Sequence, residues 1–175
     1  MKYLQNGGFQ LHPLMRLTLA LTLLLLTGFV ATNFLLYFAK MDLSPESVVS
    51  YYQGSEKEFR PPRSYQSMVE VTHGHLAMMA LVLLLLTHLL IFPPIPKGAK
   101  VAIILTAFAS ALAGEGAGWL VRFVHPDFAP LKVAAFVTLQ LCLLGILGSL
   151  ALFLIRAQYG NGTQPLPRQN SDTTP

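Results

Sequence analysis

The sequence predicts an all-α integral membrane protein: a four-helix bundle with both termini on the inner side of the membrane and one outer loop of moderate length. Composition is the first reason, because only 11% of the 175 residues are charged and 53% are hydrophobic, with a mean hydropathy of +0.53. A typical soluble domain carries about 25% charged residues. Four apolar runs are the second reason, since each reaches the roughly 20 residues that cross about 30 Å of hydrocarbon. They cover residues 14–38, 68–92, 101–124 and 129–155.

The N-terminal part consists of a short inner segment, residues 1–12, followed by the first apolar run. This run has the basic start and leucine-rich centre of a secretory signal peptide. Its apolar stretch continues to Phe38, however, well beyond the roughly 7–15 residues of a signal-peptide core. We therefore expect a retained transmembrane helix over residues 14–38.

The outer loop, residues 39–67, contains the sequence SPES, which is typical of a helix start. Ser44 is a suitable N-cap, and Pro45 would take the first helical position, where its missing N–H is not needed. The sequence thus predicts a short interfacial helix that extends to Tyr51 or Tyr52. Tyrosine rings favour the membrane–water interface, so these two side chains are expected at headgroup level.

The remaining connections are short. The turn FPPIPKGAK should make the helices over residues 68–92 and 101–124 antiparallel neighbours, and VHPDFAP leads directly into the helix over 129–155. The tail, residues 157–175, is polar, rich in proline, and lacks apolar periodicity. Such a segment is expected to be disordered.

The charges indicate an orientation, not a nucleic-acid partner. The net charge is +4, but the basic residues flank the apolar runs and form no continuous stripe. The 12 basic residues divide equally between the two sides of the predicted bundle. Those on the side of the termini lie close to the apolar runs, whereas the others are mixed with acidic residues. Juxtamembrane basic residues favour the inner side, so both termini are expected there.

The five histidines are the clearest candidates for function. His73, His75 and His88 lie on the run 68–92, while His12 and His125 each precede a proline at a helix end. Ionisable side chains at membrane depth are costly and point to function by default, and histidine is a common ligand of metals and haem iron. Helix direction then sorts them into an inner pair, His12 with His88, and an outer set, His125 with His73 or His75.

Helix geometry indicates which of His73 and His75 is the better candidate for the outer ligand. His73 and His88 are fifteen residues apart, which leaves them about 60° apart around the helix and about 22 Å apart along it. His75 and His88 would differ by about 140°. This favours His73 as the outer ligand, although Gly74 next to it leaves His75 open. The alternative for the histidines at helix ends is a capping role, and for His88 it is an interhelical hydrogen bond.

Haem b suits two levels of paired imidazoles in a four-helix bundle. A flat ring needs a neighbouring helix with little side-chain bulk, and the run of small residues at 110–118 offers one. Tight packing between helices would explain the same run. Haem propionates need cationic partners near the interfaces, for which Arg16 is a candidate inside and Arg63 and Arg122 are candidates outside. These arginines are equally explained as interface anchors.

Glu115 is the other costly residue, about 12 Å inside the outer end of its helix. A carboxyl group there should be neutral or paired. It is a candidate proton acceptor at a quinone site or a partner of an outer histidine, and the alternative is an interhelical hydrogen bond. Asn33 and Gln140 are expected to make interhelical contacts. Cys142 is the single cysteine, which excludes an intrachain disulfide, and no CxxCH motif for covalent haem is present.

The motif THGH…TH and the flanking histidines, over residues 12–155, resemble small four-helix membrane b-type cytochromes. These are quinone-linked anchor subunits that carry two haems. The resemblance implies an electron-transfer subunit of the bacterial inner membrane, not a stand-alone enzyme, that relays electrons between the quinone pool and an extracytoplasmic cytochrome or other redox subunit. In larger cytochrome b families, paired ligands on one helix are usually fourteen residues apart; here the spacings are thirteen and fifteen.

Two other functions compete with this one. HGHLAMM brings His73, His75, Met78 and Met79 within two turns of one helix, and imidazole with thioether ligands suits copper, especially Cu(I). The chain would then be a copper-binding membrane protein. Alternatively, it is a cofactor-free anchor or assembly subunit whose outer loop docks a larger complex.

Overall fold

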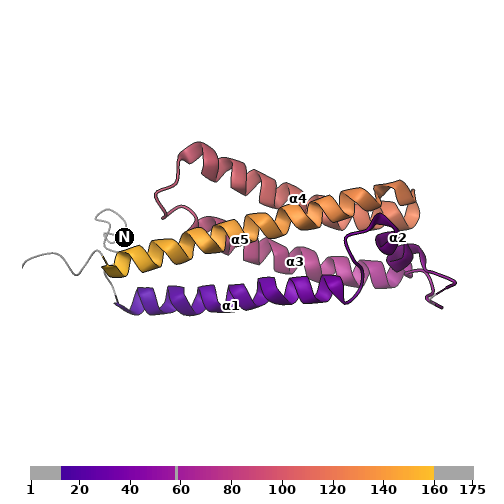
Figure 1. Cartoon of the computed structure of the whole chain (residues 1–175), viewed down its shortest axis with the longest axis horizontal. Coiled ribbons are helices and arrows are strands. Elements are labelled where there is room, and N and C mark those ends of the chain that lie inside the picture. Colours follow the sequence, from indigo (N-terminus) through magenta and orange to yellow (C-terminus); the bar gives the residue numbers. More distant parts are fainter. Residues whose placement is uncertain (1–12, 58, 160–175) are drawn as a thin grey trace, which may run out of the picture.

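The computed structural model describes residues 13–57 and 59–159, and four long helices form the bundle (Figure 1). They are α1 (Pro13–Phe38), α3 (Tyr65–Leu89), α4 (Lys97–Phe123) and α5 (Ala129–Tyr159). The short helix α2 (Pro45–Gln53) lies at one end of the bundle, and the 3-10 turn η3 (Pro126–Phe128) joins α4 to α5. The predicted all-α fold is confirmed. The segment 1–12, with His12, and nearly all of the predicted disordered tail lie outside the described residues.

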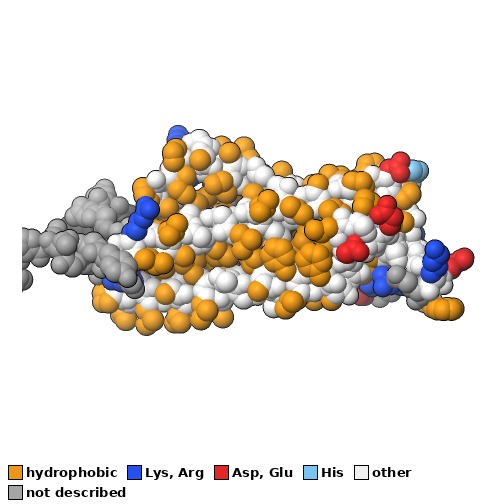
Figure 2. All heavy atoms as spheres, in the orientation of Figure 1, with side chains coloured by type: hydrophobic (Ala, Val, Ile, Leu, Met, Phe, Trp, Pro, Cys, Tyr) orange, Lys and Arg blue, Asp and Glu red, His pale blue; other side chains and the backbone are white. Residues whose placement is uncertain are grey.

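All four long helices are long and apolar enough to cross a membrane. The chain is therefore an integral, multi-pass membrane protein. Hydrophobic side chains cover much of the length of the bundle, and the acidic side chains gather at the end that carries α2 (Figure 2). Pro13 and Tyr159 begin and end the bundle at the opposite end (Figure 1). In the orientation that the sequence predicts, the α2 end is the outer end, and we use this name below.

The helix boundaries differ from the predicted ones in ways that local chemistry explains. α3 begins at Tyr65, three residues earlier than hydropathy predicts, because the Ser64 hydroxyl accepts the Ser67 N–H at 3.2 Å and caps the helix. It ends at Leu89, shortly before Pro93 and Pro94, which cannot continue a helix. α4 begins directly after Pro96, at Lys97, although the apolar run itself starts four residues later.

The inner half of the bundle is a closed apolar core. Leu86 of α3, Ala107 of α4, and Ile146 and Leu150 of α5 are completely buried in it, and α1 contributes leucines from the same level. Inside a membrane, such packing stabilises through close contact between helices, not through removal of apolar surface from water. The cavity described below lies in the other half of the bundle, beneath α2.

The short helix α2 forms as the sequence predicts. The Ser44 side chain accepts the Ser47 N–H at 3.2 Å, and Pro45 occupies the first turn. Tyr51 and Tyr52 are buried in an apolar cluster with Met68 and Val121, so their rings cover the outer end of the bundle. Their expected depth at headgroup level stays a prediction. α2 thus covers the outer end of the bundle.

Candidate functional site

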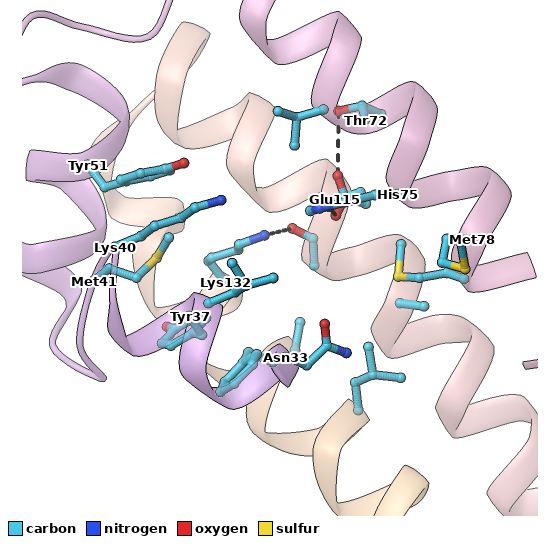
Figure 3. A pocket seen from close by; sticks show the side chains of 18 of the residues that line it. Asn33, Tyr37, Lys40, Met41, Tyr51, Thr72, His75, Met78, Glu115 and Lys132 are labelled. Atoms are coloured by element: carbon cyan, nitrogen blue, oxygen red, sulfur yellow. Dashed lines mark hydrogen bonds and ion pairs between the residues drawn. The ribbon is translucent and has the colours of Figure 1, made fainter. Parts of the chain in front are cut away.

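A cavity of about 310 Å³ lies in the outer half of the bundle, beneath α2 (Figure 3). All four long helices contribute to its walls. On α3 the lining extends from Ser67 to Met79, which corresponds to about 18 Å along the helix axis. The cavity is therefore elongated along the bundle, and it separates the inner apolar core from the cluster of tyrosines at the outer end.

One face of α3 supplies a wall of this cavity. Thr72, His75, Met78 and Met79 all line it, and their spacings of three and four residues put them on the same side of a helix. His73 is two residues from His75, points to a different side, and is exposed. His88, fifteen residues after His73, is also exposed, as their helical spacing predicts. Of the two histidines that the sequence left open, His75 is the one at the cavity.

His75 is paired with Glu115 across the interface between α3 and α4. Its Nδ1 lies 2.9 Å from Oε1 of the carboxyl group, and the Thr72 hydroxyl lies 3.5 Å from the other oxygen. The indole N–H of Trp119 donates to the Thr72 hydroxyl oxygen at 2.9 Å, which fixes that side chain from behind. The pairing that was expected of an intramembrane carboxyl group is therefore present, and its partner is a cavity-lining histidine.

The two side chains of the pair differ in how much of their surface is exposed. The Glu115 side chain is 15% exposed and that of His75 is 55% exposed. Met78, one turn below His75, is 50% exposed, and Leu36 on α1 is also exposed although both line the cavity. These residues belong to α1 and α3, so the cavity opens sideways between these two helices, toward the membrane.

Three basic side chains line the same cavity: Lys40, Arg63 and Lys132. Lys132 donates from Nζ to the Gly114 carbonyl oxygen at 2.8 Å and lies close enough to Glu115 for their charges to attract. Lys40, two residues after α1, and Lys132 of α5 extend toward the cavity (Figure 3). Lys40 and Lys132 were not among the predicted site residues, because a basic residue near a helix end is ordinarily an interface residue that indicates topology.

Two buried polar atoms at the cavity have no hydrogen-bond partner within residues 13–57 and 59–159. They are the hydroxyl oxygen of Tyr37, which is 8% exposed, and Oε1 of Gln140, which is 3% exposed. Asn33 lines the cavity nearby. Asn33 and Gln140 were expected to bridge helices, but both face the cavity instead. Because buried polar groups are nearly always paired, these atoms indicate that the cavity receives water or a ligand.

The other predicted haem ligands lie elsewhere. His88 is exposed near the inner end of α3, with its ring 6.4 Å from that of Phe92. His125 caps η3: its Nδ1 accepts the Asp127 N–H at 3.3 Å and lies 3.2 Å from the Asp127 carboxylate. Neither residue lines the cavity. Within the described chain, no group of three His, Cys, Asp or Glu side chains could hold a metal ion.

Among the small residues of α4, Gly118 allows close packing against α2. A Cβ atom on Gly118 would lie 2.8 Å from the Tyr52 hydroxyl oxygen, so the glycine makes room for this ring of α2. Gly114, by contrast, is at ordinary contact distance from Ala135 of α5. The interpretation of this run as close packing is therefore supported at Gly118, where the flat ring is a tyrosine of the chain itself.

The outer arginines hold the loop before α3. Arg122 donates from Nε to the Arg63 carbonyl oxygen at 2.7 Å, and the Arg63 guanidinium lies 4.3 Å from the centre of the Tyr51 ring. Arg63 thus both holds the loop before α3 in place and lines the cavity. Arg16 lies in the first turn of α1, at the inner end.

Comparison with known proteins adds a family. Residues 42–161 match a family described as a transmembrane helical domain, and the match includes α2, α3, α4 and α5 with the His75–Glu115 pair. No curated protein and no solved structure matches the chain. Since the match extends over more than half of the sequence, the chain belongs to this family of transmembrane helical domains.

Proposed function

We propose that this chain is an electron-transfer subunit that exchanges electrons with a membrane quinone in the outer cavity, where His75 and Glu115 exchange the protons. The observation that carries the proposal is the 2.9 Å pair of two titratable side chains on the wall of a cavity that opens toward lipid. A quinone is an amphipathic ligand that enters its site from the membrane. The site must therefore be reached sideways, as this one is between α1 and α3.

The composition of the cavity supports this class of ligand. Ligand sites are mostly apolar, with a few polar groups that fix orientation. Here Phe29, Met78 and Phe136 offer surfaces for a flat ring, and Asn33 and Gln140 can hydrogen-bond to its oxygen atoms. The unpartnered Gln140 Oε1 would accept a hydrogen bond from a quinol hydroxyl group.

The chemistry of the pair matches the reaction. Oxidation of one quinol to quinone releases two electrons and two protons. A neutral His75 and an ionised Glu115 can each accept one proton, and quinone reduction is the same step in reverse. The two electrons leave one at a time to a redox partner, for which we propose an extracytoplasmic cytochrome or another redox subunit at the bacterial inner membrane.

Haem b remains our prediction for the electron carrier within the chain. Among the described residues, His88 lies on the outside of the bundle and His125 caps its own turn. The predicted ligand pairs, His88 with His12 and His125 with His73 or His75, would need residues 1–12, a rearranged outer end, or a second chain. A pyridine haemochrome spectrum of the purified protein tests this prediction, and His88→Ala should remove one haem while leaving the other.

The quinone proposal has a direct binding test, because Trp119 is the only tryptophan and contacts Thr72 at the pair. A short-chain ubiquinone or menaquinone analogue should quench its fluorescence with saturation in detergent. Glu115→Gln removes the negative charge of the pair and His75→Leu removes its imidazole, so each loses a charge-assisted hydrogen bond, worth about 1.5–3 kcal/mol, and should weaken binding about 10-fold to 100-fold.

The control for this test is His73→Ala, which removes a histidine of the same helix that does not line the cavity. Its binding should equal that of the wild type. Quenching that does not saturate, or that is the same in Glu115→Gln as in the wild type, would refute a quinone site at this pair.

Copper binding is the second candidate, and one observation favours it. His75, Met78 and Met79 line the same wall of the cavity, which gives one imidazole and two thioether groups of the kind that bind Cu(I). His73, the fourth member of the predicted cluster, is exposed on another side. Elemental analysis of the purified protein should find stoichiometric copper if this function is correct, and Met78→Leu with Met79→Leu should remove it.

A further inference from the structure

The outer end of the cavity contains an excess of positive charge. Among its lining residues, Lys40, Arg63 and Lys132 are basic, and Glu115 is the single carboxylate. Glu115 is already engaged by His75 and Thr72. Lys40 and Lys132 lie near enough for their charges to repel one another. Glu115 attracts Lys132, so Lys40 and Arg63 are the cations that have no carboxylate to match them among the described lining residues.

Hydrogen-bonding groups surround the same place. The Tyr37 hydroxyl group is buried, lines the cavity, and has no partner among the residues that the structure describes. The Arg63 guanidinium lies over the face of the Tyr51 ring. Its N–H groups point outward in the guanidinium plane, so the ring does not cover them. Figure 3 shows the ends of the Lys40 and Lys132 side chains and the Tyr51 hydroxyl group directed into the space beneath α2.

We propose that the outer end of the cavity binds the phosphate of an anionic amphipathic molecule, held by Lys40, Arg63 and Lys132, with the apolar tail leaving between α1 and α3. An amphipathic ligand explains both parts of the lining: cations at the outer end, and the exposed apolar residues Leu36, Val71 and Met78 along the side opening. The position also matches a headgroup, since Lys40 follows the end of α1 and Arg63 precedes the start of α3.

This proposal does not rest on the quinone proposal, although both ligands would use the same cavity and Lys132, which donates to the Gly114 carbonyl oxygen, lies near Glu115. Arg63 precedes His75 by twelve residues, and His75 is ten residues inside α3, about 15 Å along its axis. The phosphate would therefore lie at the level of the headgroups, while the His75–Glu115 pair lies deeper. Loss of quinone binding would leave this proposal standing, and the reverse also holds.

The test begins with the purified full-length protein in detergent. Native mass spectrometry should show about one retained anionic phospholipid for each chain, and added phosphatidylglycerol should raise the thermal midpoint more than phosphatidylcholine does. Inorganic phosphate, added alone, distinguishes the two sources of the anion. If it raises the midpoint as much as phosphatidylglycerol does, the ligand is a soluble phosphate compound and no tail is required.

Matched variants locate the site. Lys40→Gln and Arg63→Gln each remove one charged hydrogen-bond donor and should weaken phosphatidylglycerol binding about 10-fold. Lys57→Gln removes an exposed lysine of the outer loop that does not line the cavity, and it should bind as the wild type does. An equal loss in Lys57→Gln would mean that general surface charge attracts the lipid, which would overturn the proposal.

The wild-type protein alone also decides the matter if a variant fails to fold. No retained phospholipid, together with no change in thermal midpoint on adding either phosphatidylglycerol or inorganic phosphate, would overturn the proposal without reference to any variant.

Discussion

Single side chains decide how the outer half of this bundle is built, and Gly118 is the clearest example. Its backbone lies against the Tyr52 ring, which covers the cavity from α2. Burial of the Tyr52 phenol raises its pKa, and the charge of Glu115 adds to this effect. A raised folded-state pKa means that the neutral phenol contributes stability up to about pH 10, and that this contribution is lost as the pH rises further.

Replacement of Gly118 by alanine tests this contact. The new methyl group would lie 2.8 Å from the Tyr52 hydroxyl oxygen, and overpacking of this kind costs about 1–3 kcal/mol. We expect a lower thermal midpoint in detergent despite the better helix propensity of alanine. Gly116→Ala is the matched control, because nothing lies within 4 Å of its added Cβ atom, and it should be neutral or stabilising by up to about 1 kcal/mol. Equal effects at both glycines would contradict the contact.

At the scale of elements, α2 is the helix that covers the outer end of the cavity. It is short, so its stability depends on its cap and on the packing of Val48, Tyr51 and Tyr52. Gln53 fastens its last turn to α4, donating from Nε2 to the Val121 carbonyl oxygen at 2.8 Å. The helix is therefore the part of the site most sensitive to local changes.

The N-cap of α2 gives a prediction at this scale. Ser44→Ala removes the acceptor of the Ser47 N–H and should cost about 1 kcal/mol of local stability. Hydrogen exchange of the α2 amides should be about fivefold faster, whereas exchange in α5 should not change. Ser44→Asn keeps a good cap and should exchange as the wild type does. Unchanged exchange in Ser44→Ala would mean that packing alone holds the helix.

Asp42 makes the same region sensitive to acid. The Ser44 hydroxyl and backbone N–H groups hydrogen-bond to its carboxylate and lower its pKa. A lowered folded-state pKa contributes stability above the unfolded value of about 4, and this contribution is lost as the pH falls through the folded value. The α2 amides should therefore exchange faster below about pH 4 in the wild type. Asp42→Asn should lose this acid-dependent change, and an unchanged profile would exclude Asp42 as its source.

For the whole molecule, the sequence predicts the membrane fold well because hydropathy and length are summed over many residues. Four spans and the helix after Ser44 follow from such patterns. The site was harder to predict. His75 lies on the face of α3 that carries Thr72, Met78 and Met79 and lines the cavity. The prediction instead rested on the angular offsets of His73 and His75 from His88, which do not indicate where a cavity lies. Lys132 of α5 donates to the Gly114 carbonyl oxygen of α4, next to Glu115, a contact between distant segments that no local pattern contains.

The orientation of the whole molecule in the membrane gives the last prediction. Both termini are expected on the inner side, which puts the cavity, α2 and the phosphate site near the outer face. In a Cys142→Ser background, the chain has no other cysteine. A membrane-impermeant maleimide added to intact cells should then label Lys57→Cys in the outer loop and should not label Lys97→Cys at the start of α4 until the cells are opened. The reverse pattern would invert the bundle, and the proposed quinone reaction would then exchange its protons with the cytoplasm, because the His75–Glu115 pair lies in the half of the bundle that α2 covers.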